Sequence, residues 1–294
     1  MNGILIIDKE QGWTAQDVVS KLRGITGERR IGHTGTLDPM ATGVLPIVIG
    51  KATRVSDFLI ADDKEYLCEI TFGKATDTED IWGNVIATTN LMPTEESFRR
   101  VLSSFEGPGL QTPPMYSAIK MGGKKLYELA RAGKTVERPQ REVVFHELAL
   151  LDFSNDHAKF RANVSKGTYI RTLCKDLGEA VHSMAVMSAL RRVRSGLFSI
   201  EDAITIGEFE SLTKEDQFKR LIPMDQALNL PSLRLNAKES ERVLQGQRIP
   251  TEAQFQDWVK VYGESTFLGL GQIVDGVLHV KKVLRGKDEN NQSE

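Results

Sequence analysis

The chain has 294 residues, with 40% hydrophobic and 27% charged side chains and 25 glycines, a composition typical of a globular protein with one large domain or a large and a small one. Its 38 Lys and Arg against 40 Asp and Glu leave a net charge of -2, so total charge does not point to a polyanionic partner, although a basic patch can exist within a neutral total. Residues 1–10 have no basic flank and an apolar run of only four residues, too short for a signal peptide or a membrane span. We therefore expect a cytoplasmic protein with no membrane partner.

Hydrophobic periodicity predicts strands and helices along the first two thirds of the chain. Thr14 with Asp17 three residues later forms a capping box, which predicts the start of a helix. A nearly continuous apolar run bounded by glycines predicts a buried strand over 44–50. The density of Pro and Gly predicts a long shaped loop over 107–125. The predicted strands are 3–8, 44–50, 64–73 and the first part of 159–181, and the predicted helices are 14–27, 93–107 and the last part of 159–181.

The C-terminal part of the chain predicts a small β-rich unit. A linker helix is expected over 222–231, which has a proline near each end, and a short helix over 237–246. Strands are predicted over 258–263, 267–274 and 277–284, and Asp275-Gly276 is a strong hairpin signal between the last two. The polar tail 285–294 is expected to be disordered. The sequence thus predicts domains over 1–230 and 231–294.

Several common kinds of catalytic motif are absent from the sequence. Six residues separate Gly43 from Gly50, where a phosphate loop has four, and Ala52 stands where a magnesium-binding hydroxyl should follow the Lys. No G-x-G-x-x-G follows a predicted strand, and no G-x-S-x-G is present. Cys68 and Cys174 form no Cys-x-x-Cys pair, which favours reduced thiols over a zinc site, and the five histidines lack ligand spacing. We expect chemistry by side chains alone, with no metal and no cofactor.

Asp38 lies in the glycine-rich stretch RIGHTGTLDPMATG, directly before a proline and shortly before the buried strand. Taken alone, such an Asp is more often a turn residue that binds nearby amides. The glycines, however, let the backbone approach a ligand closely, and a carboxylate at the entrance of a strand can serve as nucleophile or base. Both interpretations follow from the residues.

Two more candidates also have structural alternatives. Arg171, where a strand passes into a helix, is either a surface residue or the partner of a buried carboxylate, which a guanidinium matches well. Tyr66, in a predicted strand, is ordinarily a packing residue, and base stacking becomes the better interpretation only if the ligand is RNA.

Residues 120–141 form a basic segment within a neutral protein. Seven Lys or Arg against two Glu give it a local net charge of +5, and Tyr116 and Tyr127 are close by. A charge run is usually a solvated face, but this combination favours a groove for a polyanion. Arg191, Arg192 and Arg194 are candidates to widen that groove.

At this point the sequence resembles a known family. The blocks GILIIDKEQGWTAQDVV, RRIGHTGTLDPMATGVLPIVIGKATR, KEYLCEITFGKATDTED, QTPPMYSAIKMGGKKLYELARAG and VSKGTYIRTLCKDLGE, with the later LRRVRSG, occur in the order found in the TruB family of bacterial tRNA pseudouridine-55 synthases. The resemblance implies an α+β pseudouridine synthase fold: a large mixed, mostly antiparallel sheet flanked by helices around a central cleft, plus a small PUA-like RNA-binding domain. It also implies an isomerase that flips uridine-55 out of the T loop of tRNA, converts it to pseudouridine, and works as a monomer without a guide RNA.

The same resemblance implies roles for individual residues. Asp38 maps onto the catalytic carboxylate, Tyr66 onto the tyrosine that stacks on the target base, and Arg171 onto the arginine that pairs with the aspartate. Leu190 maps onto a leucine that packs against the site, and His33 onto a histidine that holds the T loop open. The substrate-binding and RNA-binding residues implied or expected are His33, Thr36, Leu190, Lys120, Lys134, Arg138 and Arg141.

Two alternatives remain beside this interpretation. The first is a guide-dependent synthase subunit, which the basic segment 120–141 disfavours because a stand-alone enzyme needs its own contacts to the RNA. The second is an RNA-binding protein that refolds tRNA. Asp38, Tyr66 and Arg171 disfavour a protein that only binds, although binding and refolding of tRNA can coexist with catalysis.

Overall fold

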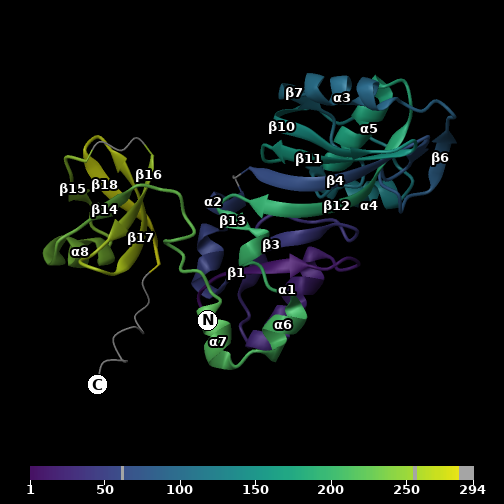
Figure 1. The fold of residues 1–294 in the computed structure, drawn as a ribbon. Coiled ribbons are helices and arrows are strands. Elements are labelled where there is room, and N and C mark those ends of the chain that lie inside the picture. Colours follow the sequence, from purple (N-terminus) through teal and green to yellow (C-terminus); the bar gives the residue numbers. More distant parts are fainter. Residues whose placement is uncertain (61–62, 254–256, 285–294) are drawn as a thin grey trace.

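The structure is a computed structural model that describes residues 1–60, 63–253 and 257–284. Its centre is a nine-stranded mixed sheet in the order β1-β3-β12-β4-β11-β10-β7, with β2 beside β3 and β13 beside β12 (Figure 1). All neighbours in this sheet are antiparallel except β3 and β12, which confirms the predicted mixed, mostly antiparallel sheet. Its strands are β1 Gly3–Lys9, β2 Ile31–His33, β3 Thr42–Ile49, β4 Lys64–Phe72, β7 Gly107–Gln111, β10 Arg141–Phe153, β11 His157–Val164, β12 Ala185–Ser195 and β13 Phe198–Ser199.

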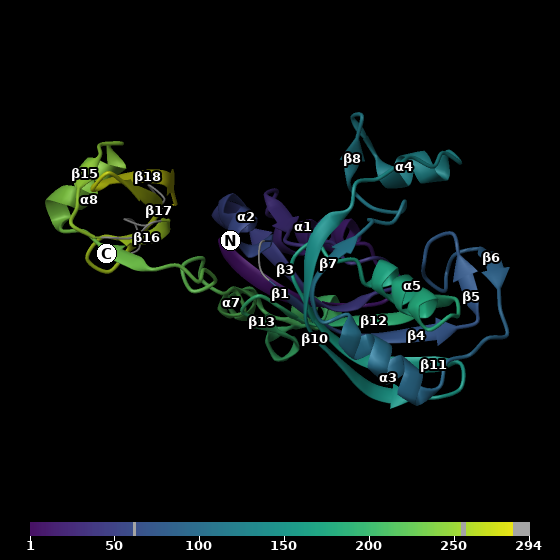
Figure 2. The same ribbon diagram turned by 90° about the horizontal axis from the view of Figure 1, so that it is seen from above.

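Helices flank this sheet, and two small hairpins extend from it (Figure 2). The hairpins pair β5 Lys74–Thr76 with β6 Val85–Thr88, and β8 Lys120–Met121 with β9 Lys124–Lys125. The helices of the body are α1 Ala15–Thr26, α2 Ser56–Ile60, α3 Glu95–Ser104, α4 Leu126–Arg131, α5 Ile170–Ala180, α6 Ile206–Ser211 and α7 Lys214–Lys219, with 3-10 turns η1 Gly50–Val55 and η2 Ile200–Asp202.

Local sequence explains where the first helix begins and ends. The Thr14 hydroxyl accepts a hydrogen bond from the Asp17 amide, while the Asp17 carboxylate accepts one from the Thr14 amide, which is the predicted capping box. Gly27 ends the helix with φ of 72°, a left-handed conformation that glycine adopts without strain. The apolar face of α1, formed by Ala15, Val18, Val19 and Leu22, is buried in the main core.

Strand β3 is almost wholly buried, as its continuous apolar sequence predicts. Its backbone approaches that of β12 closely at Gly43. Gly43 has φ of +99°, and a Cβ added there would lie 2.1 Å from the carbonyl oxygen of Arg192. The parallel pairing of Arg192 with Gly43 therefore requires a glycine at this position.

Gly43→Ala is expected to lower the free energy of unfolding by about 3 kcal/mol or more, since both the backbone conformation and the strand contact must change. The matched control is Gly24→Ala in helix α1, where an added Cβ meets nothing within 4 Å. That variant should gain about 0.5–1 kcal/mol. Urea unfolding of both variants measures the difference, and equal midpoints would contradict the inferred contact.

The C-terminal unit contains a second sheet of five strands, in the order β14-β16-β17-β18-β15, and helix α8 Ala237–Leu244 (Figure 1). Asp275 and Gly276 both have positive φ, 51° and 70°, as expected for the predicted hairpin turn. Its strands are β14 Ser232–Arg234, β15 Ile249–Pro250, β16 Trp258–Tyr262, β17 Phe267–Val274 and β18 Val277–Val283. The expected disordered tail lies outside the described residues.

The C-terminal unit shares an apolar cluster with the body. Leu270 and Leu284 belong to the same buried cluster as Val55, Leu59 and Leu228. The rings of Phe58 and Trp258 meet edge to face at 5.0 Å between centroids, and the Lys282 ammonium donates to the carbonyl of Arg54. The two units are therefore packed together rather than joined only by a linker.

Several predicted elements differ in the structure. Residues 107–125 are not a single loop, because 107–111 form edge strand β7 and 120–125 form a hairpin. The expected linker helix over 222–231 is absent, since the Ile222 amide and carbonyl instead bond to Ile4 at the edge of the main sheet. Within the part of the chain that the structure describes, no helix is long and apolar enough to cross a membrane.

Candidate functional site

Asp38 lies in the loop between β2 and β3, and this loop is anchored on both sides of it. Leu37 and Met40 are buried in the main core, so they fix the backbone next to the carboxylate. The Pro39 carbonyl accepts a hydrogen bond from the Gly12 amide at 2.8 Å. The Asp38 side chain itself remains 37% exposed, so a rigid loop presents a reachable carboxylate.

Arg171 meets this carboxylate from the first turn of α5. Its Nε lies 2.9 Å from Oδ2 of Asp38, and its own side chain is only 5% exposed. Its Nη1 and Nη2 donate to the carbonyl oxygens of Thr78 and Tyr116, at 3.0 and 2.8 Å. One guanidinium thus holds the carboxylate and two loops, while Oδ1 of Asp38 has no hydrogen-bond partner among the residues that the structure covers.

Tyr66 lies on the face of β4 that α5 covers. Residues 64, 66, 68, 70 and 72 are the buried positions of this strand. Cys68 of this set has its sulfur 3.4 Å from that of Cys174, one turn after Arg171 on α5. Because Tyr66 precedes Cys68 by two residues, its side chain lies on the same face of β4.

The two cysteines, distant in sequence, are therefore neighbours in space. Both are free and buried, and burial raises the pKa of the Cys68 thiol well above its ordinary value. Leu190 of β12 pairs with Cys68 across the sheet and is 9% exposed, which places it in the same apolar wall.

Two buried cations donate hydrogen bonds to backbone carbonyls in and near the Asp38 loop. The sequence alone did not identify either of them as part of the site. Arg192 is 1% exposed, and its guanidinium donates to the carbonyls of Val44 and Gly35, one on each side of Asp38 along the chain. The Lys9 ammonium donates to the carbonyls of Glu10 and Trp13. Burial lowers the pKa of Lys9 to about 8, against the opposing effect of the nearby Asp38 carboxylate. The sequence offers one signal for each cation: Lys9 ends the apolar strand β1, and Arg192 lies inside strand β12.

His33 is the last residue of β2, and Thr36 lies in the loop that follows it. Thr36 is exposed, whereas His33 is half-buried and its Nδ1 is buried without a hydrogen-bond partner. Burial, reinforced by the nearby Arg192 guanidinium, lowers the pKa of His33. The imidazole is therefore neutral at pH 7, with a free ring nitrogen.

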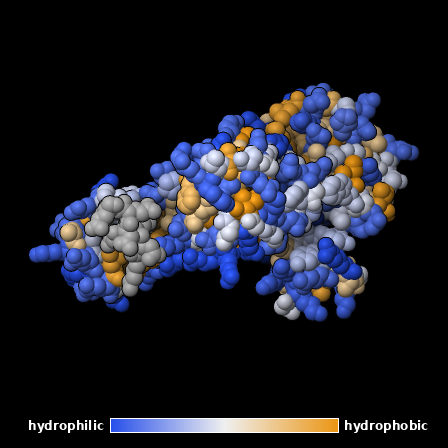
Figure 3. All heavy atoms as spheres, turned by 90° about the horizontal axis from the view of Figure 1, so that it is seen from below, coloured by the Kyte–Doolittle hydropathy of each residue, from blue (hydrophilic) through white to orange (hydrophobic). Residues whose placement is uncertain are grey.

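The basic segment 120–141 projects from the body as a hairpin followed by helix α4 (Figure 2). Lys120, Lys134 and Arg141 are exposed and Arg138 is half-buried. The Tyr127 ring lies under Lys125 and Arg131, 5.4 and 5.5 Å from its centroid. The face of the molecule seen in Figure 3 is mainly hydrophilic, with hydrophobic residues in separate patches.

The expectation that Arg192 widens a polyanion groove is wrong, whereas for Arg191 and Arg194, whose side chains are 39% and 36% exposed, it stays a prediction. Arg192 is buried, as described above. Arg191 makes two hydrogen bonds to the carboxylate of Asp8, and Arg194 is paired with Glu65. Arg191 and Arg194 thus neutralise carboxylates on neighbouring strands of the sheet. In the described ranges, no three His, Cys, Asp or Glu side chains gather as a group that could hold a metal ion.

The fold and the Asp38–Arg171 site indicate the kind of protein, and comparison with known proteins identifies its family. Residues 23–170 match the TruB family pseudouridylate synthase N-terminal domain. Residues 171–229 match the tRNA pseudouridylate synthase B C-terminal domain, and 231–284 the C-terminal domain of pseudouridine synthase II TruB. The chain has the pseudouridine synthase fold, and it is an isomerase. It belongs to the TruB family.

Individual relatives cover nearly the whole chain. It is 42% identical over 293 residues to tRNA pseudouridine synthase B of Alkaliphilus oremlandii, covering 97% of each chain. It is 39% identical over 288 residues to tRNA pseudouridine synthase B of Aquifex aeolicus, covering 97% of this chain and 100% of the relative. Among solved structures, a chain of a Cbf5-Nop10-Gar1 complex is 27% identical with a TM-score of 0.76, covering 97% of this chain and 86% of that one.

Proposed function

We propose that this protein converts uridine-55 in the T loop of tRNA to pseudouridine, without a guide RNA. The observation that carries the proposal is the pair between Asp38 and the buried Arg171, in a chain that belongs to the TruB family. The relatives named tRNA pseudouridine synthase B supply the substrate class, and the cytoplasm is where we expect the protein to meet tRNA.

The geometry supports a division of labour within the site. Isomerisation breaks the bond between C1′ and N1, joins C1′ to C5, moves a proton off C5, and leaves one on N1. Arg171 orients Asp38 through Oδ2, so that Oδ1 can assist the breaking of the glycosidic bond. Tyr66, on the face of β4 that α5 covers, would stack on the flipped uracil and help to remove the C5 proton. Leu190 would complete the apolar wall of the site.

Base flipping would use the other residues of the loop. A flipped uridine costs a few kcal/mol of unstacking, which contacts elsewhere must offset. His33, neutral and with an unpaired ring nitrogen, is suited to replace a hydrogen-bond partner inside the T loop, with Thr36 exposed beside it. We assign catalysis to the unit 1–230 and additional RNA binding to the unit 231–294.

An assay with unmodified tRNA transcript tests this function. We expect pseudouridine at position 55 after incubation with the purified protein alone. A requirement for a guide RNA would instead identify a guide-dependent subunit. Tight binding and refolding of tRNA without pseudouridine would identify a folding factor.

The exposed cations of segment 120–141 are expected to bind phosphates of the T arm. Changing Lys120, Lys134 and Arg141 together to Ala should weaken tRNA binding and lower the magnitude of the log K versus log salt slope by about 0.7–0.9 for each phosphate that the variant no longer neutralises. The rate at saturating tRNA should fall less than the affinity. Fluorescence titration of labelled tRNA across a salt series measures the slope. The matched control changes Lys219, Lys238 and Lys51 to Ala, which removes the same charge elsewhere.

A further inference from the structure

Gln111, the last residue of edge strand β7, has its side chain buried in the protein. It is only 2% exposed, whereas the preceding Leu110 is 62% exposed. The usual preference of leucine for the interior and of glutamine for the surface is thus reversed here. Because a buried amide is costly unless it is hydrogen-bonded, Gln111 needs specific partners inside the protein.

Both partners of the Gln111 amide belong to one residue, Tyr169. Oε1 of Gln111 accepts a hydrogen bond from the Tyr169 amide at 2.8 Å, and its Nε2 donates to the Tyr169 carbonyl at 2.9 Å. Tyr169 is the N-cap residue of α5, and its own side chain makes no capping hydrogen bond. Gln111 therefore satisfies the N-cap amide, which in a capping box is satisfied by a side chain of the helix itself.

The same link fixes the turn of helix that carries Arg171. The Tyr169 carbonyl also accepts a hydrogen bond from the Leu173 amide at 3.0 Å, which closes the first turn of α5 around Arg171. Gln111 thus holds both backbone polar groups of the residue at which this turn begins. A shift or rotation of the turn would move Arg171 Nε from its position 2.9 Å from Oδ2 of Asp38.

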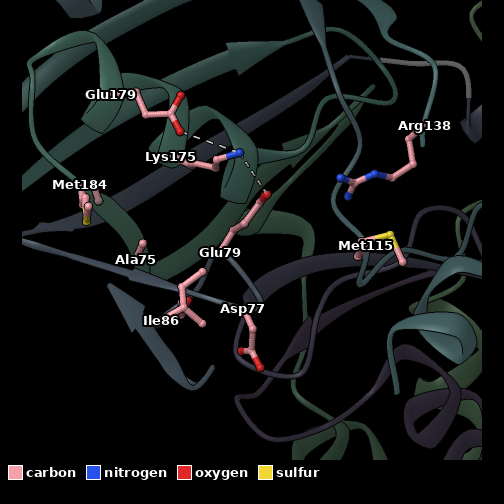
Figure 4. Close-up of a pocket in the computed structure, with 11 residues that line it drawn as sticks. Ala75, Asp77, Glu79, Ile86, Met115, Arg138, Lys175, Glu179 and Met184 are labelled. Carbon is pink, nitrogen blue, oxygen red and sulfur yellow. Dashed lines mark ion pairs between the residues drawn. The ribbon is translucent and has the colours of Figure 1, made fainter. Parts of the chain in front are cut away.

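A second link joins the segment that follows Gln111 to the same turn of α5. The Tyr116 carbonyl accepts a hydrogen bond from Nη2 of Arg171 at 2.8 Å. Two buried prolines lie between the two links and restrict the backbone of the segment. The packing beside the segment is open, because Met115 and, from α5, Lys175 line a cavity of about 210 Å³ (Figure 4). The two polar links, rather than apolar contact at Met115, therefore hold the segment to the helix.

We propose that Gln111 is a positioning residue for the catalytic pair: through the backbone of Tyr169 it fixes the first turn of α5 and so the direction from which Arg171 meets Asp38. The inference rests on the proposed function, in which this pair assists the breaking of the glycosidic bond. Gln111 is too deeply buried to contact RNA, so its replacement should change kcat and hardly change KM.

Gln111→Met keeps the length of the side chain and removes both hydrogen bonds to Tyr169. The kcat for pseudouridine formation in unmodified tRNA transcript should fall about tenfold, with KM changed by less than about twofold. The matched control is Gln217→Met, which removes another amide that is 2% exposed and donates to the carbonyls of Phe209 and Leu212 at the end of α6. It should lower the melting temperature to a similar extent and keep the wild-type kcat.

Gln111→Glu adds a readout that a purely structural role would not move. When protonated, the introduced carboxyl can donate to the Tyr169 carbonyl and accept from its amide, as glutamine does, but when ionised it can only accept. Burial favours the protonated form, whereas the charges of Arg141, the register partner of Gln111 on β10, and of Arg171 favour the ionised form. The kcat relative to wild type, measured well below the melting temperature, should be within about threefold of one at about pH 5.5 and fall about tenfold further by about pH 8.5. For Gln111→Met this ratio should not change with pH.

A double-variant cycle identifies the residue through which Gln111 acts. Arg171→Lys alone already loses the geometry of the guanidinium, so adding Gln111→Met to it should lower kcat by less than about twofold. Multiplication of the two separate losses would overturn the inference, as would a wild-type kcat for Gln111→Met together with a constant ratio for Gln111→Glu. If Gln111→Met does not fold, the pH dependence of Gln111→Glu decides. A wild-type protein that makes no pseudouridine in any RNA would overturn the proposed function and, with it, the role of Gln111.

Discussion

Asp38→Asn is expected to lower kcat by about 10³-fold or more, while the dissociation constant for tRNA changes by less than about threefold. The amide keeps the shape of the side chain in the anchored loop, but it cannot act as nucleophile or base. It also loses the charge that meets Arg171 Nε at 2.9 Å. Single-turnover formation of pseudouridine measures the rate, and a filter-binding assay measures the affinity.

The matched control for this variant is Asp57→Asn, which makes the same change at an acid whose side chain is 82% exposed. It should keep the wild-type rate. Substantial turnover by Asp38→Asn would move the catalytic role to another residue and leave Asp38 as a turn residue.

Arg171→Ala should reduce kcat by about 10²-fold and also destabilise the protein, by about 2–3 kcal/mol. The guanidinium is buried and joins the Asp38 carboxylate to the carbonyls of Thr78 and Tyr116, so its loss frees three segments at once. We expect a smaller loss of stability than for a fully buried ion pair, because Asp38 is 37% exposed and water can hydrate its carboxylate.

Arg171→Lys separates charge from geometry in the same site. Lysine keeps the positive charge, but one ammonium cannot reach the three acceptors of a planar guanidinium. We therefore expect Lys to restore part of the stability and little of the rate. Rates near wild type for both variants would make Arg171 a structural residue only.

Local patterns were enough to predict part of this fold. The capping box of α1, the buried run of β3 and the hairpin at Asp275-Gly276 each depend on neighbouring residues, and all three appear in the structure. The alternation of β4 also placed Tyr66 correctly on a strand. The pairing of Asp38 with Arg171, far along the chain, could be expected only from the resemblance to a family, since no periodicity joins residues so distant in sequence.

The missed elements depend on tertiary contacts. Strand β12 contains Arg191, Arg192 and Arg194, so its sequence resembles a charged surface. Each of these charges is met by a partner on another strand or loop. Edge strand β7 contains two glycines and a proline, which favour a loop until β10 supplies its hydrogen bonds. The segment after Ile222 fails to form a helix because pairing with Ile4 competes with it.

The apolar cluster shared by the body and the C-terminal unit makes the two parts one cooperative unit in unfolding. Removing the C-terminal unit would return Val55, Leu59 and Leu228 to water, and each large apolar side chain exposed in this way costs about 1.5–3 kcal/mol. Heat should therefore melt the chain in a single calorimetric transition, whereas loosely tethered domains melt separately. A chain cut after residue 230 keeps Asp38, Tyr66 and Arg171, yet it exposes an apolar face and should aggregate at lower temperature than the intact protein.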